Sequence, residues 1–331
     1  DWISIQQKHN GLPELNGGYF MELDDENTEV FKTAKHYRVQ GSYETSLFMR
    51  SSMGQVELRG NVGRWSRNDN VFNLDFENTI LRANQILDCF SLPMFCDDGD
   101  YWTDKDNKVR SNGAQITRLD VTRNYATGSK SDCNQFMRWL DGLSLAYIRR
   151  GRKVGSTTVQ WGSNKGRYKI IAYDKAQEMI DHACDDLQRQ AIKESPIYQY
   201  CLENGIVRLE LKLGRLELES RGLRFLGDVT MQKLTELFDE KIDFVTTPSF
   251  NTVLADADLP ASVRMTYAAY LGGVDPATIL PRETLRRHAN ALCPYGVDIL
   301  SPPNVTRLKT EIRRIEVMPV SAPEWYWSKQ A

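Results

Sequence analysis

Several features that would assign this chain to a familiar class are missing from its sequence. No apolar run reaches the roughly 18 residues needed to span a bilayer, and no signal peptide precedes the first strand-like segment, so we expect a cytoplasmic protein without a membrane partner. There is no G-x-x-x-x-G-K-[ST] loop of the kind that binds ATP. No close C-x-x-C pair occurs, and the spacing suits reduced thiols better than a zinc site or a disulfide framework. The cysteines are Cys89, Cys96, Cys133, Cys184, Cys201 and Cys293.

Positive charge is also scarce in sum, although one segment concentrates it. The 331 residues carry a formal net charge of −2, whereas a DNA-binding protein usually has a basic balance. Between residues 149 and 175, Asp174 is the single acid among many bases. This surface would suit a phosphate backbone, and the alternative is a solvated loop followed by an edge strand. The bases are Arg149, Arg150, Arg152, Lys153, Lys165, Arg167, Lys169 and Lys175.

The hydrophobic periodicity predicts an α+β fold. Alternating segments at 43–52 and 54–61 suggest a hairpin around Met53 and Gly54, and further strands are expected over 115–124, 157–161, 167–173 and 204–218. Helical spacing occurs over 78–90, 132–151 and from about 175 toward 195. We therefore predict that residues 1–225 form an antiparallel sheet with helices packed on one face. Residues 226–331 contain helical patterns at 230–241, 261–271, 281–292 and 303–315 and are predicted to form a smaller helical domain.

Three of the expected strands place polar groups on one face and apolar groups on the other. If the apolar faces pack on helices and the strands are neighbours, their polar faces form one surface that carries Asp120, Glu210 and Tyr173. The side chains that share this face are Arg118, Asp120 and Thr122, then Lys169, Ile171 and Tyr173, and finally Arg208, Glu210 and Lys212.

These residue types are suited to phosphate chemistry. Two carboxylates on adjacent strands would suit a hard divalent cation such as Mg²⁺ or Mn²⁺, which polarises a phosphate. A tyrosine hydroxyl, with an ordinary pKa of about 10, needs help to act as a nucleophile, and Lys175 is close enough in sequence to supply it. The alternative is that Asp120 and Glu210 form solvated pairs with neighbouring arginines and that Tyr173 is an ordinary strand residue.

The order of motifs resembles the gene II replication initiators of filamentous phages and related phage and plasmid rolling-circle initiators. GNVGRWSRNDNVF (60–72) is similar to a stretch that normally reads G-H-N-x-F near its end, and ITRLDVT (116–122) to an S/T-R-I/L-D strand. TTVQWGSNKGRYKIIAYDKAQE (157–178) resembles the segment that holds the nicking tyrosine, and GIVRLELKLGR (205–215) the R-x-E strand after it. LPRETLRRHANAL (280–292) and APEWYW (322–327) resemble a helix and tail of the phage members.

The resemblance implies an HUH/Rep-like nuclease domain and a role for each of these residues. Tyr173 would be the nucleophile, and Asp120 and Glu210 would lie in the metal site. Lys175 would act at the phosphate, while Glu178 would ligate or orient the metal, or would simply be a first-turn helix carboxylate.

One departure from the wider class concerns histidine. Its members usually bind metal through a His-x-His pair, and this chain has none. Asn68-Asp69-Asn70 stands where the phage pattern has Gly-His-Asn, so Asp69 would supply an oxygen ligand or would be a turn residue.

The implied activity is a metal-dependent, site-specific DNA endonuclease and strand transferase. It would nick one strand of an origin in circular phage or plasmid DNA through a 5′-phosphotyrosine and later re-join the displaced strand, with a host helicase and polymerase as further partners. The alternative is a non-catalytic origin-binding regulator on the same scaffold. The residues expected to contact DNA are Asn70, Arg118, Lys165, Arg167, Lys169, Arg208 and Arg286.

Two further expectations concern DNA contacts outside the catalytic face. The segment ending at 281–292 resembles a helix-turn-helix, with its arginines directed at phosphates or bases, although surface arginines of a bundle helix explain it equally well. Trp65, Trp161 and Tyr168 are candidates for base stacking, and the alternative for each is a core or edge aromatic.

Overall fold

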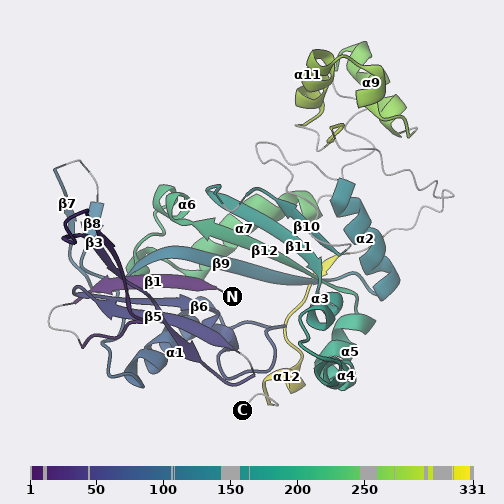
Figure 1. Cartoon of the computed structure of the whole chain (residues 1–331). Helices are drawn as coiled ribbons and strands as arrows, with labels where there is room; N and C mark the ends of the chain where they lie inside the picture. Colours follow the sequence, from purple (N-terminus) through teal and green to yellow (C-terminus); the bar gives the residue numbers. More distant parts are fainter. Residues whose placement is uncertain are drawn as a thin grey trace.

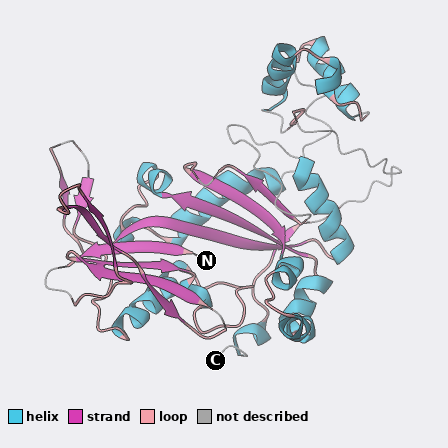
Figure 2. Ribbon diagram, viewed as in Figure 1, coloured by secondary structure: helices cyan, strands magenta, loops and turns pink. Residues whose placement is uncertain are grey.

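An antiparallel sheet forms the centre of the protein in the computed structural model (Figures 1 and 2). The structure describes residues 2–9, 13–43, 45–105, 107, 109–142, 157–163, 165–246, 259–271, 273–293, 297–300, 315 and 317–328. The strand order is β10 (Thr158–Trp161), β11 (Tyr168–Asp174), β12 (Ile206–Gly214), β9 (Gln115–Ala126), β1 (Ile3–Lys8), β6 (Gln55–Gly60), β5 (Ser46–Ser52) and β4 (Tyr37–Gln40), with β13 (Met318–Pro319) paired to β9. Two separate ribbons are formed by β2 (Tyr19–Leu23) with β3 (Glu29–Ala34) and by β7 (Tyr101–Thr103) with β8 (Val109–Ser111).

The predicted hairpin at Met53 and Gly54 joins β5 to β6 and is confirmed. Both residues have positive φ, 53° and 68° respectively, which is the conformation that a two-residue hairpin turn with the right twist requires. This tight turn sets the register of the two strands, so that Leu47, Met49 and Leu58 all point into the core.

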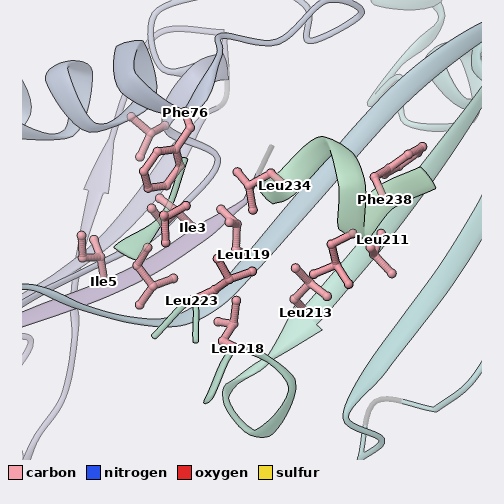
Figure 3. Close-up of a cluster of buried hydrophobic side chains, with 14 of the residues drawn as sticks. Ile3, Ile5, Phe76, Leu119, Leu211, Leu213, Leu218, Leu223, Leu234 and Phe238 are labelled. Atoms are coloured by element: carbon pink, nitrogen blue, oxygen red, sulfur yellow. The ribbon is translucent and has the colours of Figure 1, made fainter. Parts of the chain in front are cut away.

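Helices cover the apolar face of the sheet, as predicted. Leu209, Leu211 and Leu213 of β12 alternate into a core that also takes side chains from α1 (Phe76–Asp88), α2 (Lys130–Gly142), α6 (Arg215–Ser220) and α7 (Met231–Thr246). In Figure 3, Leu211, Leu213 and Phe238 form one part of this core, and Ile3, Phe76, Leu119 and Leu234 another. Burial of these side chains is the main stabilising contribution that the alternating pattern provides.

A second, smaller core lies where the chain leaves β11. The short helices α3 (Lys175–Asp181), α4 (Asp186–Glu194) and α5 (Pro196–Glu203) contact one another there (Figure 1). Val71 and Phe72 from the loop before α1 pack with Ile197, Cys201 and Tyr326 in this cluster. Tyr326 belongs to α12 (Glu324–Ser328), so the C-terminal tail is part of the same unit. The 3₁₀ turns at Val62–Arg64 and Leu226–Asp228 belong to the main core instead, through Val62 and Leu226.

The packing of α7 differs from the division predicted at residue 226. Leu234, Leu237 and Phe238 lie in the core beneath the sheet, and β13 of the tail pairs with β9. Both elements therefore pack with the sheet although they follow residue 225. The physical reason is that the apolar side of α7 packs on the main core beneath the sheet rather than on the helices that follow it in the sequence. The domain boundaries themselves, 1–225 and 226–331, stay a prediction.

The helices α9 (Ala261–Leu271), α10 (Pro276–Ile279) and α11 (Arg282–Leu292) have a core of their own, built around Val263, Leu292 and Ile299. The helix predicted over 303–315 lies almost wholly outside the described residues, as does the end of the helix predicted over 132–151. Within the described part of the chain, every helix is too short or too polar to cross a bilayer.

Replacing Leu211 with alanine tests the core beneath the sheet. Leu211 is fully buried, and its truncation is expected to lower the free energy of unfolding by about 2–5 kcal/mol through lost burial and the remaining cavity. Chemical denaturation of the purified protein measures this loss. The matched Leu187→Ala variant changes a side chain that is 82% exposed and should leave the midpoint nearly unchanged. Equal effects of the two changes would contradict the described core.

Candidate active site on the polar face of the sheet

The three strands singled out from the sequence are direct neighbours in the sheet. The register pairs Tyr173 of β11 with Arg208 of β12, and Lys212 of β12 with Asp120 of β9. Because opposed residues of an antiparallel pair point to the same face, their side chains share one surface. The adjacency that the prediction assumed is therefore present.

The Tyr173 hydroxyl donates a hydrogen bond of 2.6 Å to Oε1 of Glu210. Both side chains are largely buried, with 7% and 8% of their surfaces exposed. Burial alone would raise the pKa of Glu210, but the charges of Lys212 and Arg208 outweigh it and hold that pKa at about 2. Burial raises the pKa of Tyr173 well above 10; Arg208 opposes this rise, whereas the Glu210 charge adds to it. At neutral pH the pair is thus a phenol bound to a carboxylate.

An ammonium group bridges the two predicted metal-binding carboxylates. Nζ of Lys212 lies 2.9 Å from Glu210 Oε2 and 3.3 Å from Asp120 Oδ2. Arg118 also binds Asp120 through two hydrogen bonds of 2.9 and 2.8 Å. Asp120 and Glu210 therefore face a common point, which the Lys212 ammonium occupies. Both carboxylates are buried, so the alternative of solvated surface pairs does not apply to them. Sequence analysis placed Lys212 on this face without giving it a role.

Arg208 is 1% exposed and holds the site together from below. Its Nη2 donates to the carbonyl oxygens of Asn70 and Val71 at 2.5 and 2.6 Å, and its Nε donates to the Asn124 side chain at 3.0 Å. Arg208 was predicted to contact DNA, but its buried guanidinium is bound to these internal acceptors. Asn124 was not predicted as a site residue. It alternates with Asp120 and Thr122 along β9, and this spacing could have placed it on the same face.

The buried Lys175 and the partly exposed Glu178 form an ion pair at the start of α3. Nζ of Lys175 lies 2.7 Å from Glu178 Oε2, 2.9 Å from the Asn70 side-chain oxygen, and 5.8 Å from the centre of the Tyr173 ring. Burial, together with Arg208, lowers the pKa of Lys175. The side chain of Asn70, predicted to contact DNA, is thus bound to Lys175.

Asp69 is a turn residue, which is one of the two predictions made for the N-D-N stretch; its role as a metal ligand stays a prediction. Its Oδ1 accepts a hydrogen bond of 2.9 Å from the backbone N–H of Val71, the geometry of an Asx turn. The same oxygen accepts from the buried Tyr326 hydroxyl, which in turn accepts from Arg67 at 2.6 Å. Asp69 thereby anchors the C-terminal tail to the loop that holds Arg208.

The predicted four-carboxylate ligand set is not assembled. Across the residues that the structure describes, no three His, Cys, Asp or Glu side chains are grouped closely enough to hold a metal ion. Glu178 is bound to Lys175 and Asp69 to Tyr326, whereas Asp120 and Glu210 are bridged by one ammonium group. This pair supplies hard oxygen donors of the kind that Mg²⁺ and Mn²⁺ prefer, and an ion there would take the place of the Lys212 ammonium.

The aromatic residues suggested for base stacking pack on the core instead. Trp161 is fully buried beneath the sheet. Tyr168 packs against the same core, with Nζ of Lys241 from α7 4.7 Å from its ring centre. Trp65 also packs on that core, beside Gly41. Strand alternation places Tyr168 opposite to Tyr173, so the stacking prediction for it is wrong.

The open face continues across the sheet as a largely basic row made of two runs of opposed residues. Lys169 is opposed to Lys212, and Arg118 leads through Ser4, Arg59 and the half-buried aromatic Phe48 to Arg38 on β4. The two runs are offset by one position on this face, because Lys212 is opposed to Asp120 rather than to Arg118. Arg59 and Arg38 were missed because their strands lie far from the motifs in sequence. The row consists of Lys169, Lys212, Arg118, Ser4, Arg59, Phe48 and Arg38, and we call it the basic row.

The remaining predicted DNA contacts are dispersed. Lys165 is exposed in the turn between β10 and β11, and Arg286 is exposed on α11. Arg167 is bound to Glu217 at 3.0 Å and to the Leu216 carbonyl oxygen at 3.2 Å, beyond the end of the polar face. The basic segment from Arg149 to Lys153 lies outside the described residues.

The tail contact can be tested by replacing Tyr326 with phenylalanine. The ring stays in its cluster, but the buried Asp69 carboxylate loses a donor, so the free energy of unfolding should fall by about 1–3 kcal/mol. Thermal or chemical denaturation measures the change. The exposed Tyr37 offers a matched control, since Tyr37→Phe should be neutral. An unchanged midpoint for Tyr326→Phe would show that the tail is not anchored at Asp69.

Comparison with known proteins places this chain in a family. The family model for the N-terminal part of the phage replication-associated protein encoded by gene II matches residues 1–232, and the model for its C-terminal part matches residues 256–331. The replication-associated protein of this type from Enterobacteria phage I2-2 is 24% identical over 98% of this chain and 96% of its own length. That of Escherichia phage If1 is 26% identical over 85% of this chain and 96% of its own length.

Among solved structures, a rolling circle replication initiator protein from Geobacillus stearothermophilus matches with a TM-score of 0.26 and 12% identity, covering 67% of this chain and 75% of that protein. A likeness of this size supports no inference about this chain. The two family models, by contrast, together follow most of its length in order, and the polar face described above lies within the first of them. The chain belongs to the family of gene II type replication-associated proteins, the replication initiators of filamentous phages.

Proposed function

We propose that this protein starts rolling-circle replication by nicking one strand of circular DNA at an origin, with Tyr173 as the nucleophile. The observation that carries the proposal is the 2.6 Å hydrogen bond from the Tyr173 hydroxyl to an ionised, largely buried Glu210. A phenol held against a carboxylate in a site lined with cations has both a proton acceptor and a binding place for phosphate. Membership of a replication-associated family agrees with this activity.

The covalent step is a transfer of the phosphoryl group between two oxygens. The Tyr173 oxygen attacks the phosphorus while Glu210 accepts the phenol proton, and the bond from phosphorus to the 3′ oxygen breaks. The proton then passes to the leaving 3′ oxygen, giving a free 3′-hydroxyl and a 5′-phosphotyrosine. Reversal of the step re-joins the displaced strand. No ATP is consumed, because the phosphotyrosine bond retains the energy of the cut linkage.

Three partly exposed cations stand where the phosphate would bind. Lys212, Arg118 and Lys169 lie on the open face beside Glu210, and each offers donors to phosphate oxygens. Lys175 is fully buried and bound to Glu178 and Asn70, so its charge acts through the Tyr173 ring rather than by direct phosphate contact. Charge stabilisation of this kind contributes most where water is excluded.

Mg²⁺ or Mn²⁺ is part of this proposal. Asp120 and Glu210 would hold the ion at the point that Lys212 Nζ bridges, and Lys212 would then turn toward the phosphate. A bound divalent ion would polarise the scissile phosphate and offset charge in the transition state.

The basic row offers a path for single-stranded DNA away from the nick. Cations on successive strands, with Phe48 among them as a stacking platform, suit a flexible strand better than a rigid duplex. We further propose that a host helicase separates the strands, that a host polymerase extends the 3′-hydroxyl, and that the protein works in the cytoplasm of the bacterial host.

Replacing Tyr173 with phenylalanine should abolish nicking and preserve origin binding. The ring keeps its packing, but the oxygen that would attack phosphorus is gone. The assay is the conversion of supercoiled origin DNA to the open circle in Mn²⁺, followed by mapping of the DNA-linked peptide. Tyr168→Phe on the opposite face is the matched control and should nick normally. If wild type binds the origin but never nicks it, the protein is instead a non-catalytic regulator.

Replacing Glu210 with glutamine should slow nicking by about 10²–10⁴-fold, because an amide cannot accept the phenol proton. Single-turnover nicking rates measure this effect. Since the pKa of Glu210 is about 2 and that of Tyr173 lies above 10, the wild-type pair does not titrate between pH 5 and 9. Glu217→Gln changes a buried carboxylate on the other side of the sheet and should leave nicking intact. A nicking rate for Glu210→Gln within a few fold of wild type would exclude Glu210 as the proton acceptor.

A further inference from the structure

A cavity of about 390 Å³ opens at the edge of β9 beside the candidate active site. Strand β1 pairs with β9 as far as Leu119, and β13 pairs with it from Tyr125 onward. In the described sheet the edge of β9 between these two points has no partner strand, and the cavity fills this break. Proteins use pockets of about 300–1,000 Å³ for small ligands, so this one accommodates a single nucleoside but not a duplex.

The cavity is continuous with the candidate active site. Asp120, Asn124 and Arg208 line it, and the same three residues bind Lys212, Val71 and the 70–71 loop in the site described above. A group held in the cavity would therefore lie next to a phosphate bound at Lys212.

Two indole rings belong to the lining of the cavity. Trp2 precedes β1 and Trp327 belongs to α12, and each carries a guanidinium over its ring, Arg118 at 4.9 Å and Arg67 at 5.0 Å. Trp327 is 42% exposed although it lies in the tail that packs on the site. Indoles beside cations provide the combination of stacking and phosphate attraction that single-stranded nucleic acid uses.

The lining of the cavity combines apolar side chains with an unsatisfied acceptor. Ile3, Leu119 and Leu234 contribute to its lining, and Figure 3 shows them gathered around Phe76. Asn73 donates from Nδ2 to the Thr122 hydroxyl at 2.6 Å, whereas its Oδ1 is buried without a hydrogen-bond partner among the described residues. A buried carbonyl left unpaired costs free energy, and an N–H donor from a ligand would remove that cost.

We propose that this cavity binds one nucleobase of the strand next to the scissile phosphate. The base stacks at Trp2 or Trp327, donates a ring or amino N–H to Asn73 Oδ1, and accepts from the Thr122 hydroxyl. This inference rests on the proposed function for its substrate class, single-stranded DNA. It adds one position of that strand at which the protein recognises the identity of the base. A base without a suitable N–H leaves Asn73 unsatisfied, which is why the site discriminates.

The test uses the full-length protein and the four deoxynucleoside 5′-monophosphates, titrated separately while tryptophan fluorescence is recorded. At least one nucleotide should quench the fluorescence saturably, and deoxyribose 5-phosphate, which lacks a base, should not. Asn73→Leu should lower the affinity for that nucleotide by about tenfold, as expected for one lost hydrogen bond. The four nucleotides should then bind with similar affinities. The matched control, Asn290→Leu, changes an exposed asparagine of α11 and should bind as wild type does.

Trp327→Phe provides a second variant that does not touch the core. It should reduce both the quenching and the affinity, since Trp327 is exposed in α12. Equal binding of deoxyribose 5-phosphate, or unchanged affinity in both Asn73→Leu and Trp327→Phe, would overturn the proposal. The titration needs no nicking. A failure of Tyr173→Phe to block nicking would thus refute the proposed function alone, whereas loss of base binding would refute only the base pocket.

Discussion

The buried guanidinium of Arg208 is the constraint on which the rest of the site depends. A charge taken out of water is stable only if every donor is satisfied and opposite charge is near. Here two carbonyl oxygens of the 70–71 loop and the Asn124 side chain accept from it, and Glu210 lies two residues along the same face. Arg208 therefore fixes the loop on the sheet and helps keep Glu210 ionised. Because Glu210 is ionised, the Tyr173 hydroxyl donates its hydrogen bond to a charged acceptor.

This arrangement also explains how a chain of net charge −2 presents a basic surface. Asp120 and Glu210 on the polar face are buried and already paired, whereas the basic row from Lys169 to Arg38 lies on the open side. A net charge sums both groups, but an approaching phosphate meets mainly the exposed one. The scarcity of positive charge in the composition thus carries little information about the face that matters.

The C-terminal tail is as much a part of the site as the strands that bear its functional residues. Tyr326 binds Asp69, Asp69 shapes the turn that leads to Val71, and the carbonyl of Val71 accepts from Arg208. The tail also lines the cavity at the open edge of β9, as Trp2 does. Residues near the two ends of the chain therefore line one cavity together with Asp120 and Arg208 of the site. A division of this protein into an N-terminal catalytic part and a C-terminal part would cut through these contacts.

Local periodicity was enough to predict the central strands and the face on which the functional side chains lie. Period-two alternation in β9, β11 and β12 placed Asp120, Glu210 and Tyr173 on one side, because a strand leaves only two directions for a side chain. Burial and partnership were decided by the tertiary structure. Alternation cannot tell that Arg208 is enclosed by a loop 138 residues away, that Asp69 is engaged by a tyrosine 257 residues distant, or that Lys212 bridges the two acids. Those outcomes depend on which segments pack together, and the packing energy of distant segments is not encoded in local periodicity.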